Sequence, residues 1–165
     1  MGGVLTFILF TLLQKNKVIK KSFFPVAEIA VCSITLAHAV GRVGCFLAGC
    51  CYGKESSFGL TFPHIGTVIP TQLYEFIFLF ILTAVLIFLV LSDKLKGFNL
   101  CIYALSYSVF RFIIEFFRGD PRGAFLGIFS PSQVQSIILF FVGIVLLILR
   151  IKKQRLFVYD GAYEK

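Results

Sequence analysis

The most constraining feature of this sequence is the stretch 98–117, an apolar run that nevertheless carries an arginine and a glutamate. A run of about 20 apolar residues is long enough to cross the hydrocarbon core of a bilayer as a helix. Arg111 and Glu115 are four residues apart, so a helix places them on one face. Tyr107 and Arg118 extend that face. Inserting a charged side chain at this depth of the membrane costs about 3 kcal/mol on insertion scales. The polar face must therefore contact a polar partner or a water-filled cavity. Two interpretations follow: a structural Arg–Glu pair between helices, or a site for an anionic group at the membrane.

Composition supports a membrane protein and excludes an ordinary soluble domain. The chain has 165 residues, of which 58% are hydrophobic, and its mean hydropathy is +0.93. The formal net charge is +8, but the basic residues cluster in short segments between apolar runs. That arrangement is typical of cytoplasmic loops and not of a nucleic-acid-binding surface. We expect one membrane domain over residues 1–165 and no nucleic-acid partner.

The apolar runs predict an all-α, polytopic helical bundle with about five transmembrane helices. The predicted spans are 4–13, 22–40, 72–92, 98–117 and 133–149. The first is short for a span, and we expect it to be the remainder of a longer helix. Two glycine-rich loops, 41–70 and 118–132, connect the spans.

Charge distribution predicts the orientation. Segments 14–21, 93–97 and 150–165 hold eleven Lys and Arg residues, whereas loops 41–71 and 118–132 hold four. Because basic segments stay on the cytoplasmic side, the C-terminus is predicted inside and both glycine-rich loops outside.

The first outer loop begins with Gly41-Arg42-Val43-Gly44. Glycine allows backbone to approach a ligand closely, and an arginine forks onto phosphate oxygens. One phosphodiester headgroup would then be bound by three arginines on the outer side, Arg42, Arg111 and Arg118. The alternative is that Arg42 only snorkels to the membrane interface.

The five cysteines do not suggest a disulfide framework, since Cys32 and Cys101 lie in apolar runs. Cys45, Cys50 and Cys51 lie in the outer loop with a spacing unlike that of zinc sites, so we expect no metal there. Two other interpretations stay open. One is a nucleophilic thiol whose pKa is lowered by nearby arginines, and the other is small residues that permit close helix packing.

A polar cluster, Pro-Thr-Gln-Leu-Tyr-Glu, opens the third span at 70–75. Its polar side chains include Gln72, Tyr74 and Glu75. Acidic residues favour a helix N-terminus, which alone explains the glutamate, yet the same side chains would also line a headgroup pocket. His38 is expected to be a core residue of its helix, and His64 lies in the loop.

Six stretches together resemble one known family. They are 1–3 (MGG), 21–28 (KSFFPVAE), 41–53 (GRVGCFLAGCCYG), 70–75 (PTQLYE), 107–118 (YSVFRFIIEFFR) and 130–136 (SPSQVQS). In this order they are similar to the motifs of the prolipoprotein diacylglyceryl transferases, over essentially the whole chain.

The resemblance implies a bacterial plasma-membrane enzyme without a cofactor. It would move the diacylglyceryl group of phosphatidylglycerol to the lipobox cysteine thiol of a preprolipoprotein, and it would meet the signal peptide and the lipid bilayer. The catalytic residues implied are Arg42, Arg111, Glu115 and Tyr107. The substrate-binding residues implied are Gly53, Gln72, Tyr74, Arg118, Cys45 and Cys50.

Several positions depart from the family pattern. Met1 stands where the family has the histidine that is its candidate base, Cys45 and Ala48 replace asparagines, and Cys50 replaces a glutamate. We also expect the family's N-terminal helices to be missing. Nearby arginines that lower the pKa of the acceptor thiol would relax the need for a histidine. Two alternatives to the full activity are a related transferase with another acceptor and an inactive lipid-binding fragment.

Overall fold

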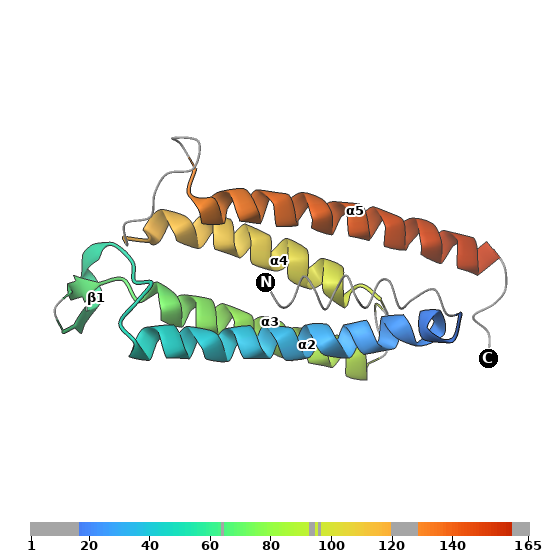
Figure 1. Ribbon diagram of the computed structural model, residues 1–165, viewed down its shortest axis with the longest axis horizontal. Coiled ribbons are helices and arrows are strands. Elements are labelled where there is room, and N and C mark those ends of the chain that lie inside the picture. The colour runs from blue at the N-terminus through green and yellow to red at the C-terminus, as the bar shows by residue number, and fades with distance from the viewer. Residues whose placement is uncertain (1–16, 64, 93–94, 96, 120–128, 160–165) are drawn as a thin grey trace.

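The computed structural model describes residues 17–63, 65–92, 95, 97–119 and 129–159, with side chains between 28 and 152. Long helices run nearly parallel to one another, and a small β-hairpin lies at one end of them (Figure 1). The elements are α2 (Lys17–Leu47), β1 (Glu55–Phe62), β2 (Gly66–Val68), α3 (Thr71–Leu91), α4 (Asn99–Ile114), the 3-10 turn η1 (Glu115–Phe117) and α5 (Pro131–Tyr159).

Four of the described helical segments are long and apolar enough to cross a membrane. They are Glu28–Leu47, Thr71–Leu91, Asn99–Phe117 and Pro131–Lys152. At most 28% of each is buried inside the bundle, so most of their apolar surface faces outward, as lipid contact requires. The predicted polytopic helical fold is confirmed for these four spans. The predicted segment 4–13 lies outside the described residues.

The helices pack as two pairs, α2 with α3 and α4 with α5, and α4 also contacts α2 and α3. Between α2 and α3, Val31 and Leu86 are buried in one apolar cluster. Stacked rings of Phe78 and Phe110, with centroids 4.0 Å apart, join α3 to α4. At the end opposite the hairpin, the Gly97 N–H donates to Glu28 of α2. These contacts hold α2, α3 and α4 together along their length.

The predicted loop 41–70 is wrong in two respects. Helix α2 does not end at Gly41 but continues to Leu47. A single glycine costs a helix only about 1 kcal/mol, and the apolar residues after it keep the helix going. The remainder of the segment contains an antiparallel hairpin, in which Phe62 of β1 pairs with Gly66 of β2. Polar and apolar side chains do not alternate regularly along β1, so the sequence of this short hairpin does not indicate strands.

The hairpin region is tied to the end of the α4–η1 span. Gly53 forms an isolated antiparallel bridge with Arg118, and the Lys54 N–H donates to the Phe117 carbonyl at 2.8 Å. A Cβ at Gly53 would lie 2.7 Å from the Cβ of Ile69 and 2.8 Å from the Phe117 oxygen. Only glycine fits between these two backbones. The contact fixes the backbone of Arg118 at the end of the bundle that carries the polar residues.

Candidate functional site

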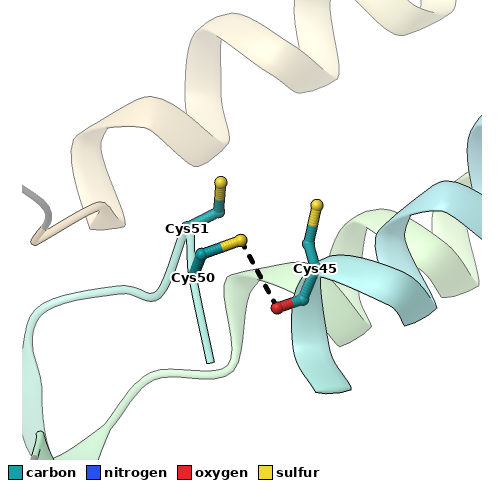
Figure 2. Close-up of side chains that lie close together, drawn as sticks. All are labelled: Cys45, Cys50 and Cys51. Atoms are coloured by element: carbon teal, nitrogen blue, oxygen red, sulfur yellow. Dashed lines mark hydrogen bonds between the residues drawn. The ribbon is translucent and has the colours of Figure 1, made fainter. Parts of the chain in front are cut away.

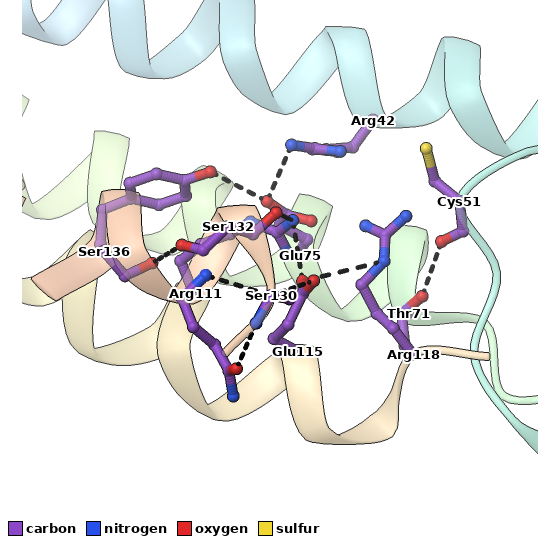
Figure 3. A network of polar contacts seen from close by, with 12 residues as sticks. Arg42, Cys51, Thr71, Glu75, Arg111, Glu115, Arg118, Ser130, Ser132 and Ser136 are labelled. Carbon is purple, nitrogen blue, oxygen red and sulfur yellow. Dashed lines mark hydrogen bonds and ion pairs between the residues drawn. The ribbon is translucent and has the colours of Figure 1, made fainter. Parts of the chain in front are cut away.

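Glu75 is the centre of the first polar cluster, which joins three helices. It lies on α3 and is 1% exposed. Its Oε1 accepts an ion pair from Arg42 Nη2 of α2 at 3.0 Å and a hydrogen bond from the Tyr107 hydroxyl of α4 at 3.1 Å. Figure 3 shows Arg42 reaching from its helix to Glu75. Of the polar residues at 70–75, Glu75 thus contacts an arginine; the headgroup pocket expected from this segment stays a prediction.

His38 belongs to the same cluster, which the sequence reasoning missed. Its Nε2 lies 3.2 Å from Arg42 Nη2 and 3.4 Å from the Tyr107 hydroxyl. A guanidinium group can only donate, so Nε2 accepts and the proton of the neutral ring is on Nδ1. The sequence could have indicated this, because His38 stands four residues before Arg42 and a helix places both side chains on one face.

The second cluster gathers around Glu115, at the start of η1. Its Oε2 is 3.0 Å from Arg111 Nη2 and 3.9 Å from Arg118 Nε. Its Oε1 accepts a hydrogen bond from the Ser130 hydroxyl at 2.8 Å. The side chains of Arg111, Glu115 and Arg118 are all at most 9% exposed. The predicted polar face of 98–117 is thus real, but Tyr107 turns from this cluster to Glu75.

The first turn of α5 completes the second cluster. Ser130 and Gln133 form a reciprocal cap, in which the Gln133 N–H donates to Ser130 Oγ at 3.2 Å and the Ser130 N–H to Gln133 Oε1 at 2.9 Å. Pro131 at the first helical position fits this start. The cap places Ser132, whose hydroxyl accepts a hydrogen bond from Arg111 Nη2 at 2.9 Å (Figure 3). These serines also went unnoticed as site residues, although their spacing matches a capping box.

The two clusters keep a surplus of positive charge. Arg42 is balanced by Glu75, whereas two arginines, Arg111 and Arg118, share Glu115. The buried Arg42 Nε and Arg111 Nη1 have no hydrogen-bond partner among the described residues. A buried donor without a partner costs about 1–3 kcal/mol, so an incoming anionic oxygen would be bound favourably. The arrangement suits a phosphate group.

Gln72 and Thr71 hold the turn after α2 instead of facing the arginines. Gln72 Nε2 donates to the Cys50 carbonyl at 2.7 Å, and Thr71 Oγ1 donates to the Cys51 carbonyl at 2.9 Å. Tyr74 is 46% exposed, and its hydroxyl has no polar contact within the described part of the chain. Its predicted role in substrate binding stays a prediction. His64 lies outside the described residues.

The three loop thiols lie together beside this turn. The Sγ atoms of Cys45, Cys50 and Cys51 are all within 4.8 Å of one another (Figure 2). Cys50 is exposed as a residue, but partial loss of hydration around its sulfur and the two neighbouring thiols raise the pKa of this thiol to about 11. The idea of a thiol with a lowered pKa is therefore wrong for Cys50.

Comparison with known proteins shows the family of the chain. The family model of the prolipoprotein diacylglyceryl transferases matches residues 1–149. The chain belongs to this family. A relative from Clostridium perfringens, named phosphatidylglycerol–prolipoprotein diacylglyceryl transferase 2, is 39% identical over 153 residues, covering 88% of this chain and 57% of the relative. A transferase of the same name, without the number, from Clostridium tetani is 36% identical over 162 residues, covering 93% of this chain and 63% of the relative.

The chain thus spans between 57% and 63% of the length of these two diacylglyceryl transferases. No solved structure matches it. The family resemblance inferred from the six stretches is confirmed, and the motifs at 41–53, 70–75, 107–118 and 130–136 are the segments that meet in the two polar clusters.

Proposed function

We propose that this chain transfers the diacylglyceryl group of phosphatidylglycerol to the lipobox cysteine thiol of preprolipoproteins. The observation that carries the proposal is that both arginine clusters are buried, and that Arg42 Nε and Arg111 Nη1 in them have no hydrogen-bond acceptor among the described residues. The proposal is supported by the names of the relatives from both Clostridium species, which are phosphatidylglycerol–prolipoprotein diacylglyceryl transferases. The donor lipid and the acceptor precursor are thus the two partners, and the bilayer is the medium in which they meet.

In the proposed reaction, the acceptor sulfur attacks the carbon of the diacylglyceryl group that is bonded to the phosphate oxygen. A carbon–sulfur bond forms, the carbon–oxygen bond to the phosphate breaks, and the thiol proton is lost to the medium. Glycerol phosphate leaves with an added negative charge. Fixed cationic donors at a buried site stabilise such a developing charge strongly. Arg42 and Arg111 are the residues that we assign to this task.

The remaining residues of the clusters position these two arginines. Glu75 and Tyr107 hold Arg42 from the side of α3 and α4. Glu115 holds Arg111 at 3.0 Å and keeps Arg118 nearby. We propose that Arg118, with Gly53 of the adjoining backbone, lines the lipid-binding region.

The proposed orientation follows from the charge pattern and the position of the clusters. Both clusters lie towards the hairpin end of the bundle, away from the basic end of α5. Because basic segments remain cytoplasmic, the clusters face the outer leaflet of the plasma membrane and the C-terminus is inside. Secreted precursors present their lipobox on that side.

A transfer assay in membranes tests the proposal. Phosphatidylglycerol labelled in its diacylglyceryl group is incubated with a lipobox peptide and with the full chain or its Arg111→Lys variant. Lysine keeps the charge but loses the planar fork, so transfer should fall about 100-fold or more. Arg150→Lys is the matched control, because Arg150 lies at the far end of α5 over Phe98.

Three outcomes distinguish the alternatives. Label on the peptide thiol that is lost in Arg111→Lys and kept in Arg150→Lys supports the proposal. Label released from the lipid but absent from the peptide overturns the acceptor and points to a different transferase. If the unaltered chain shows no turnover, the proposed transferase activity is refuted, and an inactive lipid-binding protein is the remaining alternative.

A further inference from the structure

The thiols of Cys45, Cys50 and Cys51 form a group of their own at the end of α2. The substrate-binding role that the resemblance implies for Cys45 and Cys50 stays a prediction. Cys45 lies in the last turn of α2, and the other two lie in the turn that follows. Their sequence spacing gave no reason to expect a metal site. The fold nevertheless brings the three thiols close together, with every pair of Sγ atoms within 4.8 Å (Figure 2).

This spacing is close to what one metal ion requires of three thiolates. With zinc–sulfur bonds of about 2.3 Å, the sulfur atoms of a tetrahedral site lie about 3.8 Å apart. Small side-chain rotations therefore suffice to bring the three Sγ atoms to ligand positions. A disulfide would join only two of them and leave the third thiol over. None of the three cysteines forms a disulfide in the structure.

The backbone that carries the thiols is held from several sides. The Cys50 N–H donates to the Cys45 carbonyl at 3.1 Å, which closes the turn onto the end of α2. Buried Gln72 and Thr71 of α3 donate to the carbonyls of Cys50 and Cys51. Cys51 has a φ of 66°, a left-handed conformation that costs a residue with a side chain about 1–2 kcal/mol. The surrounding hydrogen bonds hold it there, so the backbone that carries the three thiols is fixed before an ion arrives.

An ion can also reach the cluster. The Cys50 side chain is exposed, and those of the other two cysteines are half-buried. Three sulfur ligands select soft cations, and ions such as Zn²⁺ and Cu⁺ bind thiolates in preference to Mg²⁺ or Ca²⁺. A site with three protein ligands and an accessible side leaves a fourth position for water or another thiol.

We propose that Cys45, Cys50 and Cys51 bind one thiophilic metal ion, Zn²⁺ or Cu⁺, at the outer end of α2. Each thiol loses a proton on binding and contributes one metal–sulfur bond. The three ligands are different residues from the arginines and glutamates of the two polar clusters, so metal binding can be measured without a transfer assay.

Metal titration of the purified, fully reduced chain tests the site. Zn²⁺ is added in competition with a chromogenic chelator, and Cu⁺ is added anaerobically in a second series. We expect one ion per chain and a loss of affinity of at least 100-fold in Cys45→Ala, Cys50→Ala and Cys51→Ala. Cys32→Ala and Cys101→Ala are the matched controls, because these two thiols are buried in the helices away from the cluster. The controls should bind like the unaltered chain.

A measurement on the unaltered chain guards against variants that fail to fold. Bound Zn²⁺ should protect the three cluster thiols from alkylation, as read by peptide mapping, and leave Cys32 and Cys101 unchanged. Binding of neither ion by the reduced chain overturns the proposal. So does equal binding by a variant that lacks all three thiols, or a disulfide between two of them after anaerobic purification.

Discussion

Replacing Glu75 with glutamine tests whether the first cluster is a true buried ion pair. Glutamine keeps the shape of the side chain and one carbonyl acceptor but removes the charge. Arg42 then remains in the bundle without its counter-ion, and the Tyr107 hydroxyl donates to a neutral oxygen. The Glu75 side chain is 2% exposed and that of Arg42 is 16% exposed, so water can compensate little.

The expected cost follows from these contacts. Removing one partner of a buried ion pair destabilises a protein by about 3–5 kcal/mol. The partial exposure of Arg42 places the effect near the lower end, about 3 kcal/mol. That is roughly a 100-fold fall in the folding equilibrium constant. If Arg42 is replaced as well, the uncompensated charge disappears. The variant Arg42→Met with Glu75→Gln should therefore recover at least about 1 kcal/mol relative to Glu75→Gln alone.

Unfolding in mixed micelles with increasing dodecyl sulfate provides the assay. Because the chain has no tryptophan, helicity is followed by circular dichroism. Glu55→Gln on the exposed start of β1 is the control and should change the free energy of unfolding by less than about 0.5 kcal/mol. A loss below about 1 kcal/mol for Glu75→Gln, or additive effects of the two substitutions, would refute the buried pair.

Three further predictions concern the backbone and the turn. Gly53→Ala places a Cβ 2.7 Å from Ile69 and should lower the free energy of unfolding by about 1–3 kcal/mol. A Cβ at Gly41 meets nothing within 4 Å, so Gly41→Ala should stabilise the helix. Melting curves in detergent that rank the two variants the other way would contradict this prediction. Ser130→Ala removes both the α5 cap and a hydrogen bond to Glu115, and melting should show a loss of about 1–2 kcal/mol. Since the pKa of Cys50 is raised to about 11, its metal-free thiol is neutral at pH 7, and its alkylation rate should rise with pH and level off only above that pKa. A rate already at its plateau at pH 8 would show a lowered pKa.

Much of the fold was predictable because membrane spans leave a strong signal. Twenty apolar residues in a row admit few structures besides a helix, so four predicted spans match described helices. The extension of α2 beyond Gly41 was missed because glycine marks helix ends and is also tolerated inside helices. The hairpin was missed because short strands without regular alternation resemble loops.

The site was predictable only in part. Charged residues in apolar runs mark function in membranes, and this logic found Arg111 and Glu115 from their spacing alone. The sequence had no means of dividing the residues into two clusters, since the pairing of Tyr107 with Glu75 instead of Glu115 depends on how α3 and α4 pack. Convergence of the three thiols depends on the turn after α2, whose left-handed Cys51 has no sequence signature.

Binding of phosphatidylglycerol tests most directly whether the arginine clusters form an anion site. The full chain, its Arg111→Gln variant and its Arg150→Gln variant are titrated with this lipid in nanodiscs of a zwitterionic lipid, and bound lipid is counted by native mass spectrometry. The account predicts at least tenfold weaker binding for Arg111→Gln and unchanged binding for Arg150→Gln. Equal affinity in all three proteins would contradict it, and Arg111 and Glu115 would then be only a structural pair.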